Sequence, residues 1–152
     1  MKTIASFQVN HDKLTPGIYV SRIDGDITTY DLRTRIPNAG DYMDHITMHS
    51  LEHMFATYVR NAEIGSRVIY FGPMGCQTGF YLLIRNADNN EVLEAVKAVL
   101  CQIIDHDGEM FGATRIACGN YQNLSVESAK TEARRYLDAL NAIPEVTFRY
   151  EE

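Results

Sequence analysis

The stretch IYVSRIDGDITTYDLRT, residues 18–34, decides the fold class. Its two halves, Ile18 to Ile23 and Asp26 to Thr34, are rich in the β-branched and aromatic residues that favour strands. Asp24-Gly25 lies between them, and this dipeptide is typical of a two-residue hairpin turn because both turn positions favour a positive φ. The stretch therefore predicts two antiparallel strands joined by a tight turn.

Further strands are expected after this hairpin. Arg67 to Phe71 and Gly79 to Arg85 have a similar composition and flank the tight segment GPMG at residues 72–75. A short strand near Thr114 to Ala117, and another at Val146 to Tyr150, would complete a small sheet.

Three segments have the periodicity of amphipathic helices. The first runs from about Asp44, a suitable N-cap, to about Ala62, with Gly65 just beyond it. The second runs from about Asn90 to His106, and the third starts at Ser125. Hairpin-linked strands with helices between the pairs predict an α+β fold, a small antiparallel sheet covered on one face by about three to four helices. The second sheet face would pack against a partner, which predicts a homodimer.

Length and composition exclude several classes of protein. A chain of 152 residues is expected to form a single domain over residues 1–152, and its 45% hydrophobic and 22% charged residues are unlike those of a disordered chain. The net charge of −6 argues against a nucleic-acid partner. No apolar run reaches the roughly 20 residues of a membrane span, and no signal peptide is recognisable.

The cysteines support a cytoplasmic location. Their odd number favours reduced thiols over disulfides, and they are Cys76, Cys101 and Cys118. Cys101 lies in an apolar helical stretch and is interpreted as a core residue. Cys76 and Cys118 each adjoin a glycine, where open space and backbone freedom suit chemistry better.

The motif HSLEH at residues 49–53 indicates a metal site. Residues four apart on a helix share one face with Cβ atoms about 5–6 Å apart, so His49 and His53 can bind one divalent ion. Glu52 borders the same face and is well placed as a proton-transfer base. The alternative is a solvated helix face that carries two histidines by chance.

A catalytic metal site usually has three protein ligands and an open position. The candidates for the third ligand are Cys118, Cys76, His11, His106 and the carboxylates. Cys118 is a good soft ligand at the expected junction between a strand and the third helix, although a buried free cysteine is the alternative. Cys76 lies in the glycine-rich turn GPMGCQTG, residues 72–79, where a thiol could act as acid or base or could be a structural turn residue.

Two further segments are weak signals by themselves. SFQVNH, residues 6–11, offers the hydroxyl of Ser6 and the imidazole of His11. Arg33 ends an expected strand, and a lone arginine there is by default a surface charge.

The order of these motifs resembles that of the S-ribosylhomocysteine lyase (LuxS) family over nearly the whole chain. The matching segments are SF…H at 6–11, DLR at 31–33, HSLEH at 49–53, PMGCQTG at 73–79 and ACG at 117–119. The resemblance implies metal ligands at His49, His53 and Cys118, acid–base residues at Glu52 and Cys76, and substrate contacts at Ser6, His11 and Arg33. It departs at Tyr70, where the family usually has an aspartate.

The resemblance also implies an activity and an assembly. The family cleaves S-ribosylhomocysteine to homocysteine and 4,5-dihydroxy-2,3-pentanedione, the autoinducer-2 precursor, by metal-assisted carbonyl migration and β-elimination. One divalent ion per subunit is implied, with Fe²⁺ expected and Zn²⁺ or Co²⁺ able to substitute. The family is a homodimer with two active sites at the subunit interface.

Two other functions are compatible with the metal motif. One is a small metal-dependent hydrolase, like a peptide deformylase or an inverted zinc protease, although deformylase has the opposite order, His-Glu-x-x-His, and the proteases are much longer. The other is a non-catalytic metal-binding signalling domain. Such a domain needs only His49, His53 and Cys118, so Glu52 and Cys76 would be dispensable.

Overall fold

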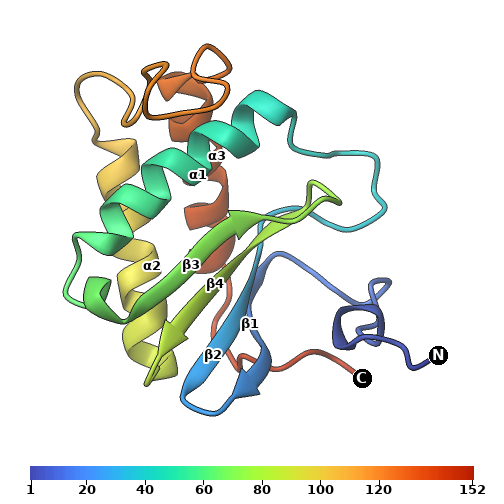
Figure 1. The fold of residues 1–152 in the computed structure, drawn as a ribbon. Helices are drawn as coiled ribbons and strands as arrows, with labels where there is room; N and C mark the ends of the chain where they lie inside the picture. Colours follow the sequence, from blue (N-terminus) through green and yellow to red (C-terminus); the bar gives the residue numbers. More distant parts are fainter.

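The computed structural model describes residues 1–152 and contains one four-stranded sheet with three α-helices (Figure 1). The strands are β1 (Gly17–Asp24), β2 (Ile27–Arg33), β3 (Val68–Pro73) and β4 (Gly79–Arg85), and their order in the sheet is β1-β2-β4-β3. The helices are α1 (His45–Arg60), α2 (Asn89–Ile104) and α3 (Val126–Asn141), with short 3-10 turns η1 (Ala5–Phe7) and η2 (Gly65–Arg67). Every strand pair is antiparallel, so the predicted α+β class is confirmed.

The opening hairpin forms with a turn shifted by one residue. Asp24 pairs with Ile27, so the two turn residues are Gly25 and Asp26 rather than Asp24 and Gly25. Only Gly25 has a positive φ, 62°. This matches the turn type that needs glycine at its first central position alone.

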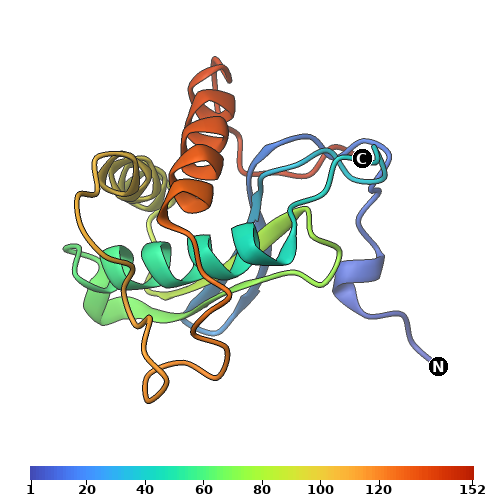
Figure 2. The same ribbon diagram turned by 90° about the horizontal axis from the view of Figure 1, so that it is seen from above.

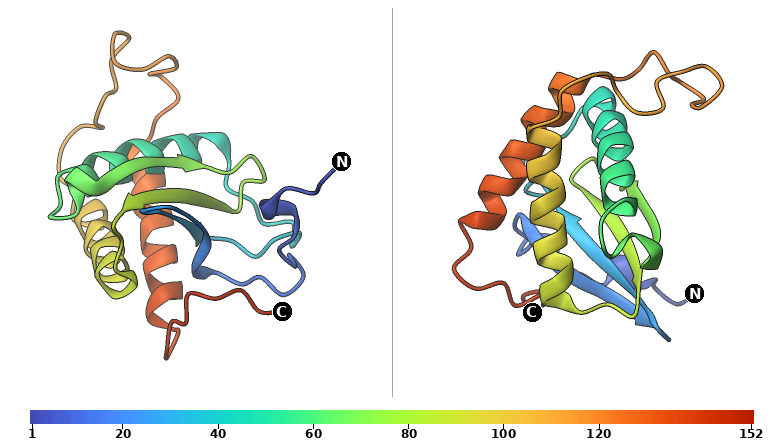
Figure 3. Two further views of the ribbon diagram at one scale, coloured as in Figure 1. Left: turned by 60° about the horizontal axis from the view of Figure 1, so that its bottom comes forward. Right: turned by 90° about the vertical axis from the view of Figure 1, so that its left-hand side faces the viewer.

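The three helices cover the same face of the sheet (Figure 3). Inward side chains of the strands, such as Tyr30 and Leu82, are fully buried against them. The rings of Phe55 on α1, Phe71 on β3 and Phe80 on β4 stack in sequence, with centroids 4.3 and 5.0 Å apart. These residues belong to one cluster of 26 buried side chains, which fixes α1 against the sheet.

Side-chain caps begin the helices where the sequence predicts them. Asp44 accepts a hydrogen bond from the backbone N–H of Thr47 at 2.7 Å, and Ser125 accepts one from Ser128 at 3.2 Å. Such caps satisfy backbone donors that a helix leaves unpaired. The predicted N-cap of α1 and the predicted start of the third helix at Ser125 are therefore confirmed, and α1 and α2 each end about two residues earlier than predicted.

Three predictions about the fold are wrong. Residues 114–117 form a turn rather than a strand, and residues 146–150 form no strand because Phe148 has a φ of 61°, which interrupts extended backbone. Cys101 is exposed, since its neighbours Leu100 and Ile103 take the buried face of α2. None of the helices is both long and apolar enough to cross a membrane.

Candidate active site

His49 and His53 lie on one face of α1, as their spacing predicts. Their ring centroids are 4.7 Å apart, and Cys118 Sγ lies 3.4 Å from His49 Nε2. One nitrogen of each ring and the sulfur all lie within 4.8 Å of one another. The structure thus brings together two imidazoles and a thiol that could hold a metal ion.

Backbone carbonyls orient both rings. His49 Nδ1 lies 2.9 Å from the carbonyl oxygen of Asn123, and His53 Nδ1 lies 2.8 Å from that of Phe111. A carbonyl can only accept, so each Nδ1 carries the proton and each Nε2 keeps a free lone pair. This is the arrangement that fixes histidines as metal ligands.

The segment between α2 and α3 supplies both carbonyls and Cys118, and it extends alongside α1 (Figure 2, orange). Gly112 in this segment has a φ of 64°, and a Cβ there would come within 3.3 Å of His53 Nδ1. Glycine at this position therefore allows the backbone to approach the imidazole. Sequence reasoning placed Cys118 at a strand–helix junction, whereas it follows a turn in which its N–H donates to the carbonyl oxygen of Thr114 at 3.0 Å.

The sulfur of Cys118 has a donor as well as a histidine beside it. The backbone N–H of Asn120 donates to Sγ at 3.4 Å, an interaction that stabilises negative charge on sulfur. Glu52 lies next to His53 on α1 and is half-buried. Its role in proton transfer stays a prediction.

A second group of predicted residues lines a cavity of about 360 Å³ on the other side of the sheet. Ser6, His11, Arg33 and Cys76 all contribute to its wall, and Phe7, Asp31, Tyr81 and Tyr150 are among its other residues. The cavity therefore collects every predicted substrate-binding residue and one of the two predicted acid–base residues.

Arg33 is buried, which contradicts its default interpretation as a surface charge. Its side chain is 3% exposed, and Nε and Nη2 donate to the carboxylate of Asp31 at 3.1 and 2.7 Å. Burial opposes the positive charge, but the hydrogen bonds and the charge of Asp31 outweigh it and raise the pKa of Arg33. A permanent cation thus lies in the cavity wall.

Cys76 lies beside this cation. Arg33 Nη1 is 3.8 Å from Cys76 Sγ and donates to the hydroxyl of Thr78 at 2.8 Å, and that hydroxyl lies 3.0 Å from the same sulfur. The turn that presents Cys76 is closed by a hydrogen bond from Met74 N–H to the carbonyl oxygen of Gly79, 2.9 Å. Sequence reasoning missed Asp31 and Thr78, although both lie within two residues of a predicted site residue.

Tyr70 does not line this cavity. It is 52% exposed, and its hydroxyl occupies the space that a side chain at residue 72 would need, so Gly72 accommodates the ring. The position at which the family resemblance would place a carboxylate therefore carries a phenol that covers β3.

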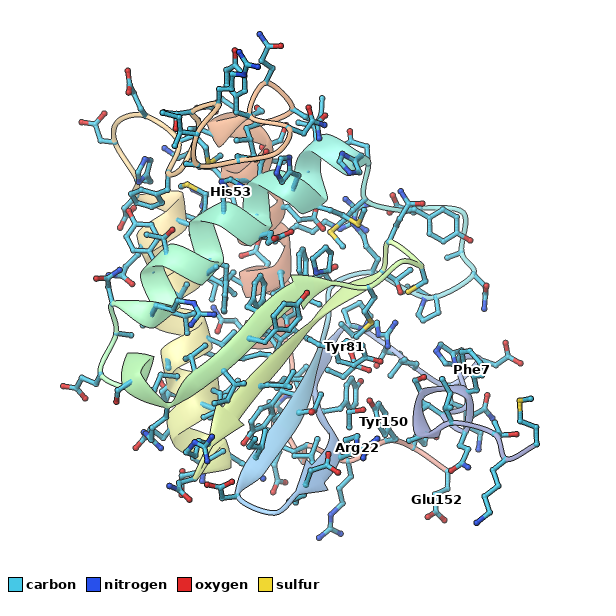
Figure 4. The ribbon with its side chains drawn as sticks, viewed as in Figure 1. Phe7, Arg22, His53, Tyr81, Tyr150 and Glu152 are labelled. Atoms are coloured by element: carbon cyan, nitrogen blue, oxygen red, sulfur yellow. The ribbon has the colours of Figure 1, made fainter.

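The two groups of site residues remain separate within one chain. His49, His53 and Cys118 do not line the cavity that contains Cys76. Figure 4 shows His53 on α1 beside the segment that precedes α3, well apart from Tyr81, Tyr150 and Phe7 around the cavity. One chain therefore holds two separate groups of candidate site residues.

Comparisons with known proteins agree over the whole length of the chain. A model of the S-ribosylhomocysteinase (LuxS) family matches residues 4–146. The S-ribosylhomocysteine lyases of Finegoldia magna and Clostridium acetobutylicum are 41% and 39% identical to this chain, and each alignment covers 100% of both proteins. The S-ribosylhomocysteine lyase of Borreliella afzelii is 39% identical over 99% of each chain. The His–His–Cys group, the cavity around Cys76 and these full-length similarities together establish that the chain belongs to the S-ribosylhomocysteinase (LuxS) family.

Proposed function

We propose that this protein is an S-ribosylhomocysteine lyase, which releases homocysteine and 4,5-dihydroxy-2,3-pentanedione from S-ribosylhomocysteine. The observation that carries the proposal is the cavity in which Cys76 Sγ lies 3.8 Å from the buried guanidinium of Arg33. A deprotonatable thiol beside a fixed cation is what repeated proton transfer on a sugar requires. The full-length similarity to lyases of this substrate supports the same assignment.

The reaction needs two proton-transfer groups. The carbon that carries the sulfur is not initially β to a carbonyl, so the carbonyl must migrate along the sugar until it is, and only then can elimination break the carbon–sulfur bond. Each migration removes a proton from one carbon and returns a proton to its neighbour. We assign these transfers to Cys76 and Glu52, which lie on different elements and can reach different sides of a substrate. The final elimination expels the homocysteine thiolate, which takes up a proton, and consumes no water.

The donor set fits a divalent ion. His49 and His53 present Nε2 atoms whose partner nitrogens are held by carbonyls, and Cys118 presents a sulfur that accepts an N–H. Two imidazoles and one thiolate suit Fe²⁺, Zn²⁺ or Co²⁺, and we propose Fe²⁺ from the family resemblance. The bound ion would supply Lewis acidity to the sugar oxygens on which negative charge develops.

Residues of the cavity wall would hold the substrate. Arg33 offers a guanidinium, Ser6 a hydroxyl and His11 a ring whose Nδ1 lies 2.9 Å from the carbonyl oxygen of Val9. That contact leaves His11 Nε2 free to accept from a sugar hydroxyl. These three side chains are therefore proposed to bind and orient the substrate.

We propose that the active site is completed in a homodimer. Within one chain the His–His–Cys group and the cavity around Cys76 are separate, so neither can perform the whole reaction. The N-terminal segment projects from the body of the chain (Figure 1) and carries the exposed Ile4 and Phe7, the second of which borders the cavity. A two-fold pair that buries this region would place the cavity of each chain against the metal ligands of the other.

We also propose that the protein acts in the cytoplasm, because all three of its cysteines are free thiols.

The test is direct. Purified protein loaded with Fe²⁺ or Co²⁺ is incubated with S-ribosylhomocysteine, and the released homocysteine is measured as free thiol. Steady thiol release that disappears in His49→Ala supports the proposal. A metal-loaded preparation that releases no thiol but hydrolyses a formylated peptide would instead support the hydrolase function.

A further inference from the structure

The C-terminal tail crosses from the helical layer to the cavity. After α3 the chain passes the edge of β1, where the carbonyl oxygen of Phe148 accepts a hydrogen bond from Val20 N–H at 2.8 Å. The Phe148 side chain is buried in the core, and its φ of 61° redirects the following residues. Tyr150 consequently lies on the cavity side, near Tyr81 (Figure 4).

Two interactions fix the ring of Tyr150. It stacks on Tyr19 of β1 with centroids 5.1 Å apart and planes 15° apart. Its hydroxyl donates to Asp31 Oδ2 at 2.8 Å. Burial, followed by the charge of Asp31, raises the pKa of Tyr150 well above its ordinary value, so the hydroxyl remains a donor throughout the neutral range.

Asp31 links Tyr150 to the site. Its Oδ2 accepts both the Tyr150 hydroxyl and Arg33 Nη2, the latter at 2.7 Å. The Asp31 carboxylate is only 1% exposed. If the Tyr150 hydroxyl is removed, water cannot take its place as a donor unless the surrounding side chains move. The opposite edge of Arg33 faces Thr78 and the sulfur of Cys76. A chain of contacts therefore runs from the tail to the thiol.

The Tyr150 hydroxyl affects how strongly Arg33 interacts with Asp31 on one side and with Cys76 on the other. A carboxylate with two donors binds each of them less strongly than it would bind one alone. When Tyr150 donates to Asp31, Arg33 is neutralised less completely, and more of its positive charge remains available at Cys76 Sγ. Without that donor, Asp31 would draw Arg33 towards itself and away from the sulfur.

We propose that Tyr150 is a positioning residue, whose hydroxyl holds Asp31 so that Arg33 keeps its guanidinium beside Cys76. The inference rests on the proposed function, because it gives Cys76 a role in proton transfer. Tyr150 lies beyond residue 146, where the match to the family model ends. The tail thereby contributes a residue to the chemistry of this chain that the family motifs do not include.

The experiment compares Tyr150→Phe with Tyr19→Phe. Both substitutions keep a stacked ring and remove one hydroxyl, but the Tyr19 hydroxyl donates to the carbonyl oxygen of Thr15 at 2.8 Å and takes no part in the Asp31 network. Iodoacetamide alkylation of Cys76 is followed over a range of pH by mass spectrometry of peptides, with the exposed Cys101 of the same molecules as internal reference. Steady-state kcat and KM are measured in parallel.

In Tyr150→Phe we expect alkylation of Cys76 to slow by about three- to tenfold relative to Cys101. This is smaller than the full effect of one hydrogen bond to a charged group, because the lost bond to Asp31 acts on Cys76 through Arg33. Its kcat/KM should fall by a similar factor, and Tyr19→Phe should match the wild type in both measurements. The inference is overturned if Cys76 in Tyr150→Phe is alkylated at the wild-type rate, or if both variants slow its alkylation equally. Slower alkylation in a protein that releases no homocysteine would refute the proposed function and leave the positioning role intact.

Discussion

Cys118 Sγ lies 3.4 Å from His49 Nε2, although 69 residues separate them in the sequence. The sulfur approaches the imidazole because carbonyls of the same segment hold the two histidine rings. The segment and α1 thus form the candidate metal site together, and neither by itself contains all three of its residues.

Cys118→Ala should therefore lose metal. We expect Co²⁺-loaded wild type to show the near-ultraviolet absorption of a thiolate ligand and the variant to lack it and to retain less metal after dialysis. His45→Ala is the matched control, since His45 is an exposed histidine one turn before His49 and lies outside the His–His–Cys group. An unchanged Co²⁺ spectrum in Cys118→Ala would exclude the sulfur as a ligand.

Cys76→Ser and Glu52→Gln should separate proton transfer from metal binding. Each variant is expected to lose about 10²–10⁴-fold in turnover while keeping the metal content of the wild type, because acid–base groups typically contribute that much. Cys101→Ser, which changes an exposed cysteine on α2, serves as the control and should remain fully active. If both site variants lose metal and regain full activity on reconstitution, they act as ligands instead.

A shared active site can be tested by mixing two inactive variants. His49→Ala and Cys76→Ala are combined under conditions that exchange subunits. In a mixed dimer with shared sites, one site carries both substitutions and the other carries neither, so an equal mixture should recover about a quarter of wild-type activity. Sites contained within one chain would all remain defective, and no mixture would recover. Light scattering at micromolar concentration should give the mass of a dimer.

The loop before α1 depends on a buried ion pair. Arg35 donates to both carboxylate oxygens of Glu132 on α3, at 2.9 and 2.6 Å, and the Glu132 side chain is 3% exposed. Glu132→Ala removes the buried partner and leaves the guanidinium with only the exposed carboxylate of Asp41, 2.7 Å from Nη1. It should lower the free energy of unfolding by about 1–3 kcal/mol. The exposed Glu127 on the same helix is the control, and its alanine variant should lose at most about 1 kcal/mol. Equal urea midpoints for the two variants would show that the pair does not hold the loop.

Alkaline pH should weaken the fold through Tyr30. This residue is fully buried, and burial with the nearby charge of Asp88 raises its pKa to about 12. An unfolded tyrosine ionises near pH ~10, so between about pH 10 and 12 the unfolded chain loses a proton that the folded chain keeps. The free energy of unfolding should therefore be unaffected below pH ~10 and fall above it. Urea midpoints for Tyr30→Phe should decline less steeply with pH than those of the wild type.

Local features were predictable from the sequence alone. Examples are the hairpin around Gly25, the cap at Asp44, the start of α3 at Ser125 and the shared face of His49 and His53. All of them depend on residues within about four positions of each other. Backbone preferences and helical periodicity act over that range, so pattern and structure agree. The turn differs from its predicted position by one residue, and this difference also involves only neighbouring residues.

The roles of residues from different elements required the tertiary structure. From the sequence alone, Arg33 is by default a surface charge. It is buried because Asp31 pairs with it and because Tyr150, 119 residues after Asp31, covers that pair. Cys101 lies in an apolar stretch yet is exposed, because the packing of α2 selects which side of the helix faces the sheet. The sequence by itself determined the three helices, the four strands of the sheet and the spacing of the histidines. Packing between distant segments decided that the two other expected strands do not form, which charges are buried and which cysteine meets the imidazoles. Local preferences cannot encode such contacts, since their free energy comes from excluding water between elements that meet only when the chain is folded.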